Sequence, residues 1–308
     1  MTEPMRLAER IDAGATPRRI LIIRNPTAGR PAARARFQRV LERLSEQGCR
    51  ITERITEARG DAERFAREAD RAEHDVIAVA GGDGTLNEVV NGLGPEAPPL
   101  AVIPLGTVNL FAREIGLARE TDAIVETILN GAPHTIRLGA VNGRRFLMVA
   151  GIGFDAHVVR GVGPRIKRAL GVVAYALRFL LELFRFRFPR YAVEADGVRF
   201  SVASAVISKG RYYAGPFVLA PRAGLAKPAF DLCLFRAGGV VAALSYALAL
   251  GLGRLARHPS VSQLDAKEVR IDGPAGEPIQ LDGDTPPGLT LPARVTLAVQ
   301  PLEVLMPA

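Results

Sequence analysis

The sequence is poor in cysteine, in aromatic residues and in long apolar runs, and each shortage excludes a class of protein. Cys49 and Cys233 are its only cysteines, so it has neither a disulfide framework nor a zinc-binding spacing, as is typical of a reducing cytoplasm. Aromatic residues make up 6% and do not alternate with the arginines, which argues against nucleic-acid binding. The first 14 residues lack the apolar centre of an export signal. The longest apolar run, Val240 to Leu252, is shorter than the roughly 20 residues that a membrane-spanning helix needs. We therefore expect a cytoplasmic protein without a membrane span.

Positive charge is in excess. Lysine and arginine total 40 against 32 acidic residues, giving a formal net charge of +8. A positive surface suits nucleotide phosphates or anionic lipid, although a coding bias toward arginine also contributes. With 308 residues, of which 48% are hydrophobic, the chain is long enough for two packed domains.

A buried strand, a glycine turn and a helix are predicted between Asp75 and Leu93. The apolar run before Gly81 has the length of a strand, and apolar residues recur at helical spacing after Asp83. The backbone N–H groups and the helix dipole at such a turn favour a phosphate, and glycine lets it approach closely. An acid at Asp83 is unfavourable there unless it accepts a proton or holds Mg²⁺. The alternative is that Asp83 only caps the helix.

Two further polar turns follow predicted strands. The turn Asn25 to Arg30 follows a strand at 19–23, and the turn Pro104 to Asn109 follows one at 99–103. Strands alternate with helices through residue 130, which predicts a parallel sheet whose strand ends share one edge. We therefore expect the three turns to meet there.

The pattern changes after residue 133. Asn142-Gly143 and Asp196-Gly197 each lie between two short strand-like runs, which is a hairpin signal. The run that follows Asp196-Gly197 is 198–208. We predict an α/β domain at 18–133 and an antiparallel β-sandwich domain at 134–294. The segment 166–188 is amphipathic with a cationic border, which suits a membrane surface or an acyl chain, and 240–255 is expected to cover the sandwich.

The motif GGDGTLNEVVNGL, with NPTAGR before it and PLGTVNLFAREIGL after it, resembles the diacylglycerol kinase catalytic-domain family. That family includes bacterial lipid kinases and sphingosine kinases, and NAD kinases are more distant relatives. The resemblance extends from about Arg19 to the last predicted strand. It implies a nucleotide-binding α/β domain followed by a β-sandwich, and it allows residues 295–308 to return to the first domain.

The resemblance also implies roles for individual residues. Asp83, Asp282 and Asp284 would be catalytic, with Asp83 favoured as the base and the other two as Mg²⁺ ligands, although which carboxylate is the base stays open. Asp284 stands where glutamate is usual. By analogy with sphingosine kinases, Asp155 would contact the lipid head group. The residues implied to bind ATP are Asn25, Thr27, Gly29, Gly81, Gly82, Gly84, Thr85, Asn87, Glu88, Gly106, Thr107 and Asn109.

One loop departs from the family pattern. Many bacterial relatives carry an aspartate-aspartate-glycine loop there, and some of them use it to bind a structural magnesium. In this sequence Asp231 remains, while Lys227 and Pro228 stand where acids are usual. We therefore predict that this metal site is absent or rebuilt.

Together these features predict an ATP- and Mg²⁺-dependent kinase that phosphorylates a hydroxyl of a diacylglycerol-like or sphingoid lipid. The acceptor would enter between the domains, and the protein would contact the inner membrane face peripherally. Two alternatives stay open, an NAD kinase-like enzyme acting on a soluble nucleotide and a catalytically weak lipid-binding regulator. The sequence names neither the lipid nor the oligomeric state, and a homodimer is compatible with it.

Overall fold

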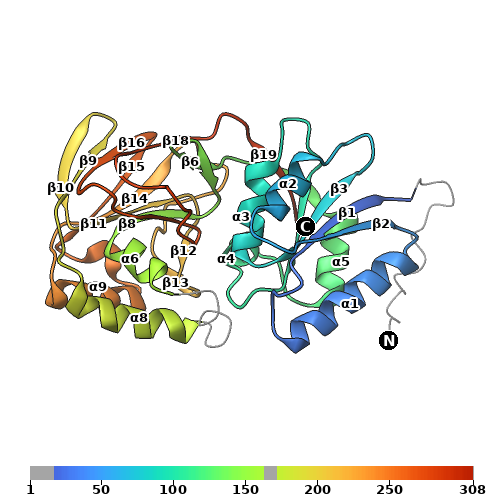
Figure 1. Cartoon of the computed structure of the whole chain (residues 1–308), viewed down its shortest axis with the longest axis horizontal. Helices are drawn as coiled ribbons and strands as arrows, with labels where there is room; N and C mark the ends of the chain where they lie inside the picture. The colour runs from blue at the N-terminus through green and yellow to red at the C-terminus, as the bar shows by residue number, and fades with distance from the viewer. Residues whose placement is uncertain (1–16, 163–171, 308) are drawn as a thin grey trace, which may run out of the picture.

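The computed structural model describes residues 17–162 and 172–307 (Figure 1). Two units lie side by side, one built on a mostly parallel sheet with helices and the other on antiparallel sheets. The predicted fold class is therefore confirmed. The beginning of the predicted amphipathic segment, including Ile166, Lys167 and Leu170, lies outside the described residues.

The first sheet has six strands in the order β2-β1-β3-β4-β19-β5. Four neighbouring parallel strands form most of it, namely β2 (Arg50–Ile55), β1 (Arg19–Arg24), β3 (Val76–Gly81) and β4 (Leu100–Pro104). Every residue of β3 and β4 is buried, as expected for apolar strands that helices cover on both faces.

The sheet is completed from the far end of the sequence. β19 (Leu302–Met306) pairs in parallel with β4 and antiparallel with β5 (Ala132–Ile136). This strand lies within the stretch 295–308. The first sheet thus includes residues on both sides of the boundary predicted after residue 133.

Helices cover both faces of this sheet because alternate strand residues point to opposite sides. Ile20 and Ile22 pack with α1 (Pro31–Glu46) and α5 (Thr121–Asn130). Leu21 and Ile23 belong to the core on the other side, which contains residues of α2 (Asp61–Arg67), α3 (Asp83–Gly92) and α4 (Leu110–Glu114).

Two antiparallel sheets with a shared apolar core form the second unit. The first has the order β10-β9-β16-β18-β6-β7, and the second has the order β15-β14-β11-β8-β17. Their strands are β6 (Gly139–Val141), β7 (Arg144–Phe146), β8 (Val149–Gly153), β9 (Tyr191–Ala195), β10 (Val198–Val202), β11 (Ser204–Ser208), β14 (Phe230–Phe235), β15 (Val261–Ala266), β16 (Glu268–Asp272), β17 (Ile279–Leu281) and β18 (Ala293–Leu297).

The two hairpin turns predicted from the sequence are present. Asn142-Gly143 joins β6 to β7, and Asp196-Gly197 joins β9 to β10. All four turn residues have positive φ, between 45° and 87°, as a two-residue hairpin turn requires. The prediction of a single strand at 198–208 is wrong, because the chain passes from one sheet to the other at Ala203, between β10 and β11.

Within the described residues of the second unit, α-helices and a short hairpin lie outside the two sheets. They are α6 (Phe154–Arg160), α8 (Val172–Arg185), α9 (Val240–Gly251) and the hairpin of β12 (Tyr212–Tyr213) with β13 (Phe217–Val218). Helices α8 and α9 contact each other beside the β15-β14-β11-β8-β17 sheet (Figure 1). In the part of the chain that the structure describes, no helix has the length and apolar character needed to cross a bilayer.

Candidate active site

The three polar turns meet at one edge of the first sheet, because β1, β3 and β4 are parallel neighbours. The N–H groups of Leu105 and Gly106 donate to the carbonyl of Gly81 at 2.9 and 3.2 Å. A side chain on Gly29, whose φ is +81°, would come within 2.6 Å of the Leu105 carbonyl oxygen. Glycine is therefore required where these turns approach each other.

Side chains of the first two turns also contact each other. The Asn25 side-chain oxygen accepts the N–H of Thr27 at 3.0 Å and its hydroxyl at 2.9 Å, which closes the first turn. The Asn25 amide donates to the hydroxyl of Thr85 at 3.3 Å. Gly81 packs on Thr85, and Gly82 lies against Gly106. Most of the residues predicted to bind ATP are thus brought to one edge.

Asp83 connects the second turn to the third. Its carboxylate oxygens accept the N–H groups of Leu110 and Phe111 at 3.1 and 3.2 Å, and so it caps the N-terminus of α4. Asn109, just before α4, has φ +52° and donates its side-chain amide to the carbonyl of Gly106 at 2.5 Å. Asp83 therefore fixes the position of α4 as well as lying in the predicted phosphate turn.

Asp282 is buried at the contact between the two units. Its two oxygens accept the N–H groups of Leu147, Met148 and Val149 at 2.8 to 3.0 Å and the side-chain amide of Asn87 at 2.8 Å. Burial raises the pKa of this carboxyl, and the hydrogen bonds oppose that rise. Four donors occupy the four acceptor positions of a carboxylate, which does not fit the role of a Mg²⁺ ligand predicted for Asp282.

Asp83 and Asp282 nevertheless face the same small gap. Leu86, Leu110, Phe111, Leu147 and Met148 complete its lining. The structure thus brings together the acids of two motifs that are far apart in the sequence. Within the described residues, no group of three or more histidine, cysteine, aspartate or glutamate side chains is arranged to hold a metal ion.

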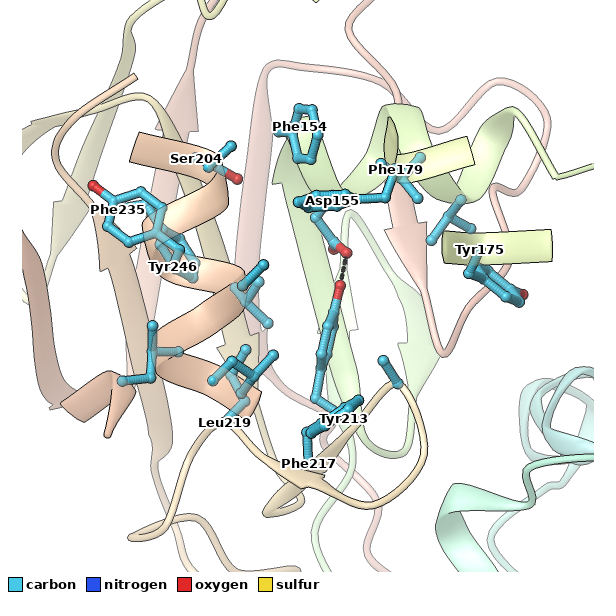
Figure 2. Close-up of a pocket in the computed structure, with 18 of the residues that line it drawn as sticks. Phe154, Asp155, Tyr175, Phe179, Ser204, Tyr213, Phe217, Leu219, Phe235 and Tyr246 are labelled. Carbon is cyan, nitrogen blue, oxygen red and sulfur yellow. Dashed lines mark hydrogen bonds between the residues drawn. The ribbon is translucent and has the colours of Figure 1, made fainter. Parts of the chain in front are cut away.

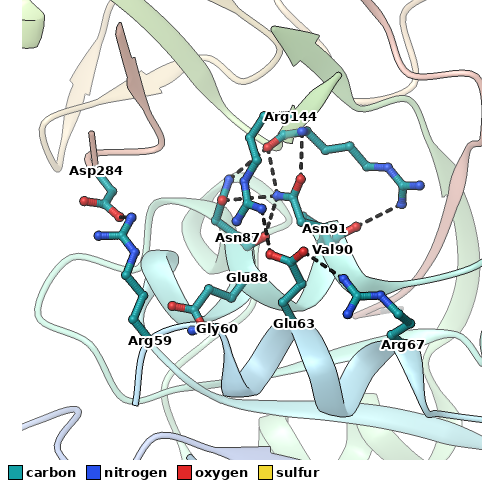
Figure 3. Close-up of polar contacts among 11 residues, drawn as sticks. Arg59, Gly60, Glu63, Arg67, Asn87, Glu88, Val90, Asn91, Arg144 and Asp284 are labelled. Carbon is teal, nitrogen blue, oxygen red and sulfur yellow. Dashed lines mark hydrogen bonds and ion pairs between the residues drawn. The ribbon is translucent and has the colours of Figure 1, made fainter. Parts of the chain in front are cut away.

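Asp284 and Glu88 both contact the chain just before α2 (Figure 3). The Asp284 carboxylate is half-exposed and pairs with Arg59 at 2.7 Å. Glu88 accepts the N–H of Gly60 at 3.0 Å at the start of α2, and partial burial raises its pKa. Neither residue lines the gap between Asp83 and Asp282.

Polar contacts from α3 fix the two units to each other. Asn87 and Asn91 donate their amides to the carbonyl of Arg145 in β7 at 3.2 and 3.1 Å, and the N–H of Arg145 returns a bond to Asn91 at 2.8 Å. The Arg145 guanidinium donates to the carbonyls of Val90 and Leu93, both at 2.9 Å, at the C-terminal end of α3. Asn87, predicted to bind ATP, is thus engaged at the contact between the units.

A large apolar pocket of about 470 Å³ lies within the second unit (Figure 2). It is bounded by α6, α8, α9, the outer face of β11 and the β12–β13 hairpin. Its lining is almost entirely apolar and includes Phe154, Phe179, Leu219, Phe235 and Leu250. A pocket of this size and character suits a ligand with an apolar body.

Asp155 is the acidic residue in the lining of this pocket. It is buried at the start of α6, and its carboxylate accepts the hydroxyl of Tyr213 (Figure 2). The same carboxylate also accepts the side-chain amide of Gln280 at 2.9 Å. Burial raises the pKa of the Asp155 carboxyl and also that of the Tyr213 phenol. The side-chain oxygen of Gln280 accepts the N–H of Gly283 at 2.9 Å, so this acid is linked to the turn that carries Asp282.

The hairpin that carries Tyr213 is also held by the first unit. Glu114 of α4 accepts the N–H of Arg211 at 2.9 Å and its guanidinium at 3.0 Å, and it lies 3.4 Å from the N–H of Tyr212. Asp83 caps the other end of α4. Helix α4 therefore connects the predicted phosphate turn to the wall of the apolar pocket.

Positively charged side chains occupy the loop for which the family resemblance predicted an absent or rebuilt structural metal site. Buried Asp231 accepts the N–H of Arg222 at 3.2 Å and pairs with its guanidinium at 3.3 Å. Lys227 pairs with Asp265 at 2.8 Å. The arginine and the lysine thus supply positive charge beside both acids, and the absence or rebuilding of the metal site stays a prediction.

Sequence reasoning missed Tyr213, Gln280, Glu114 and Arg145. Gln280 lies two residues before Asp282, and this position beside a predicted catalytic acid is the one signal that could have indicated a role for it. Tyr213 lies in a short aromatic segment between Gly210 and Gly215, a pattern of an exposed turn with no functional meaning by itself. The contacts of Glu114 and Arg145 join segments more than 50 residues apart, which no local pattern predicts.

Comparison with known proteins agrees with this geometry. The family model described as diacylglycerol kinase catalytic domain matches residues 19–141, and the YegS C-terminal NAD kinase beta sandwich-like domain matches residues 148–306. Diacylglycerol kinase of Bacillus subtilis is 33% identical over 94% of this chain and 97% of its own. Its counterpart in Staphylococcus carnosus is 30% identical over 94% of this chain and 95% of its own.

Solved structures share the fold. One from Bacillus anthracis covers 96% of this chain and 98% of its own with a TM-score of 0.79 at 21% identity. Another, a diacylglycerol kinase of the same strain, covers 94% and 96% with a TM-score of 0.71 at 21% identity. On the family models and the identity to the curated relatives, the chain belongs to the diacylglycerol kinase family of lipid kinases.

Proposed function

We propose that this protein transfers the γ-phosphoryl group of ATP to the hydroxyl of a diacylglycerol-like lipid. The observation that carries the proposal is the apolar pocket with a buried acid, Asp155, linked through Gln280 to the turn of Asp282. A soluble nucleotide acceptor has no acyl chain to fill such a pocket. The NAD kinase-like alternative is therefore less well supported than a lipid acceptor.

The proposed acceptor site differs in one respect from the sequence prediction. We assign the acyl chain to the pocket inside the second unit rather than to a cleft between the domains. The head group would lie at the Asp155 end, because Gln280 hydrogen-bonds both to Asp155 and to the turn that carries Asp282 at the contact between the units. The nucleotide would lie at the three turns of the first unit, which glycines allow to approach one another closely, and the N–H groups at the start of α3 suit a phosphate.

The reaction needs positioning and one proton acceptor. The lipid hydroxyl oxygen forms a bond to the γ-phosphorus, the bond from that phosphorus to the bridging oxygen breaks, and ADP leaves. We assign the hydroxyl proton to the Asp83 carboxylate, because it lies at both the phosphate turn and the gap between the units. Asp282 would position Asn87 and the 147–149 backbone. Mg²⁺ would accompany the ATP phosphates, as is usual for this ion.

The test is transfer of labelled γ-phosphate from Mg·ATP into dioleoylglycerol in mixed micelles, with NAD as a parallel acceptor. Label in the organic phase is the expected result. Label on NAD alone would make the protein a soluble nucleotide kinase, and label on neither would leave a lipid-binding regulator.

Substitution Asp83→Asn tests the assigned base. We expect turnover to fall at least about 100-fold, the contribution typical of a positioned general base. Because Asp83 also caps α4, binding of a fluorescent ATP analogue and the melting temperature are measured alongside turnover. Near-normal turnover in a folded variant would exclude Asp83 as the base.

A further inference from the structure

We infer that the paired outer faces of α8 and α9 insert into the surface of an anionic bilayer, and that the apolar pocket opens into this inserted face. The membrane contact stands on the surface itself, whereas the entry of lipid through it rests on the proposed function. From the sequence, only the segment 166–188 was expected to touch a membrane, and the structure adds α9 to that surface.

Helix α8 exposes an uninterrupted apolar stripe. Phe184 is 81% exposed, and four other large apolar side chains on the same stretch are about half exposed. Its charged residues Arg178 and Glu182 pair with each other at the next turn instead of interrupting the stripe. The exposed apolar residues are Val173, Leu177, Leu180, Leu181 and Phe184.

Helix α9 is apolar on two sides. It has no ionisable group other than the Tyr246 phenol, which hydrogen-bonds to backbone near Ala237. One side places Ala243 and Tyr246 at the pocket, while the other exposes large residues to solvent, among them Val241 at 82%. A helix that only covered a sandwich would expose polar residues on its outer side. The outward apolar residues of α9 are Val241, Leu244, Leu248 and Leu252.

The pocket is continuous with this surface. Leu180 of α8 lines the pocket and is 52% exposed. Phe217 of the β12–β13 hairpin also lines the pocket and is exposed to solvent. An acyl chain could therefore pass from a membrane into the pocket without exposing its methylene groups to water, which would be unfavourable.

The charges beside the two helices fit anionic head groups. The sequence has no acidic residue at positions 183–193 or 232–264. Exposed arginines lie at the end of each helix or just after it: Arg185 is the last residue of α8, Arg187 follows it, and Arg254 and Arg257 follow α9. An apolar face next to unopposed basic side chains is the pattern of helices that lie in the interface of an anionic membrane.

The experiment is co-sedimentation with vesicles, without ATP, so that its outcome is independent of catalysis. The double variant Phe184→Glu with Leu248→Glu places one acid on each stripe. Val299→Glu is the matched control, because Val299 is an apolar residue 99% exposed on another surface. Circular dichroism shows whether each variant is folded.

We expect the unaltered protein to bind phosphatidylglycerol-containing vesicles more tightly than pure phosphatidylcholine vesicles, with a preference that added salt weakens. The double variant should bind at least about tenfold more weakly, by roughly 1.4 kcal/mol, and the control should bind as the unaltered protein does. Unchanged binding of the folded double variant would overturn the inference. So would a vesicle-free dimer that the double variant dissociates, because a second copy would then cover the face.

Discussion

At the scale of single residues, the second unit contains a fully buried lysine side chain, which is unusual because lysine is rarely buried. Lys209, after β11, is completely buried, and its ammonium donates to the carbonyls of Lys227 and, at 3.3 Å, Ala229. Burial, together with the nearby cations Arg137 and Lys227, lowers the pKa of Lys209 to about 8. This lysine holds the loop of Arg222 and Lys227 in place by hydrogen bonds to backbone alone.

The pKa of Lys209 predicts a pH dependence of stability. Below pH 8 the lysine is protonated in both states, and its burial as a cation opposes folding. Between pH 8 and about 10.5 the unfolded chain binds a proton that the folded protein does not, so stability rises with pH, by up to about 1.4 kcal/mol per pH unit. Urea unfolding of the unaltered protein and of Lys209→Met should therefore diverge across this range.

A matched control for this experiment is Lys267→Met, which removes an exposed lysine. Its stability curve should stay parallel to that of the unaltered protein. A parallel curve for Lys209→Met would contradict the lowered pKa.

At the scale of elements, α4 shows what local sequence can and cannot predict. The turn before the helix, Pro104 to Asn109, was predicted from the sequence, because glycine and polar residues that follow an apolar run are local signals. The contacts at the two ends of α4 were not predictable, because each joins the helix to another element: Asp83 of α3 caps its N-terminus, and Glu114 at its C-terminus binds Arg211. The same distinction explains why both hairpin turns were found while the change of sheet at Ala203 was not.

Substitution Glu114→Gln should weaken the connection between α4 and the β12–β13 hairpin. The charge-assisted bonds to Arg211 are lost in part, at a cost of about 1.5–3 kcal/mol. Because the hairpin carries Tyr213 at the pocket, we expect KM for the lipid to rise roughly tenfold or more with KM for ATP unchanged. Steady-state kinetics with each substrate varied separately measures this.

Glu96→Gln, which alters an exposed acid on the loop after α3, is the control and should leave both KM values unchanged. If Glu114→Gln lowered kcat alone, the connection would serve the chemical step instead of lipid binding.

At the scale of the whole molecule, the contact between α3 and β7 decides how independently the two units unfold. All five tyrosines lie in the second unit, and the sequence has no tryptophan. Tyrosine fluorescence therefore follows the second unit, while far-ultraviolet circular dichroism follows the helices of both. Coincident transitions by the two probes would indicate cooperative unfolding.

Substitution Arg145→Met removes the two bonds from the guanidinium to the end of α3. We expect the free energy of unfolding to fall by about 2–3 kcal/mol and the two transitions to separate in urea. Arg199→Met, at an exposed site in the same sandwich, should leave them coincident. Coincident transitions in both variants would show that Arg145 does not couple the units.

The position of β19 has a consequence for synthesis on the ribosome. This strand lies between β4 and β5, yet it is translated after the entire sandwich. During translation the first sheet therefore stays incomplete, because β4 has an unpaired edge and β5 has no neighbouring strand until β19 is made. The first unit to be made is thus the last to be finished, and premature termination upstream of Leu302 would release a sandwich attached to an incomplete, aggregation-prone sheet.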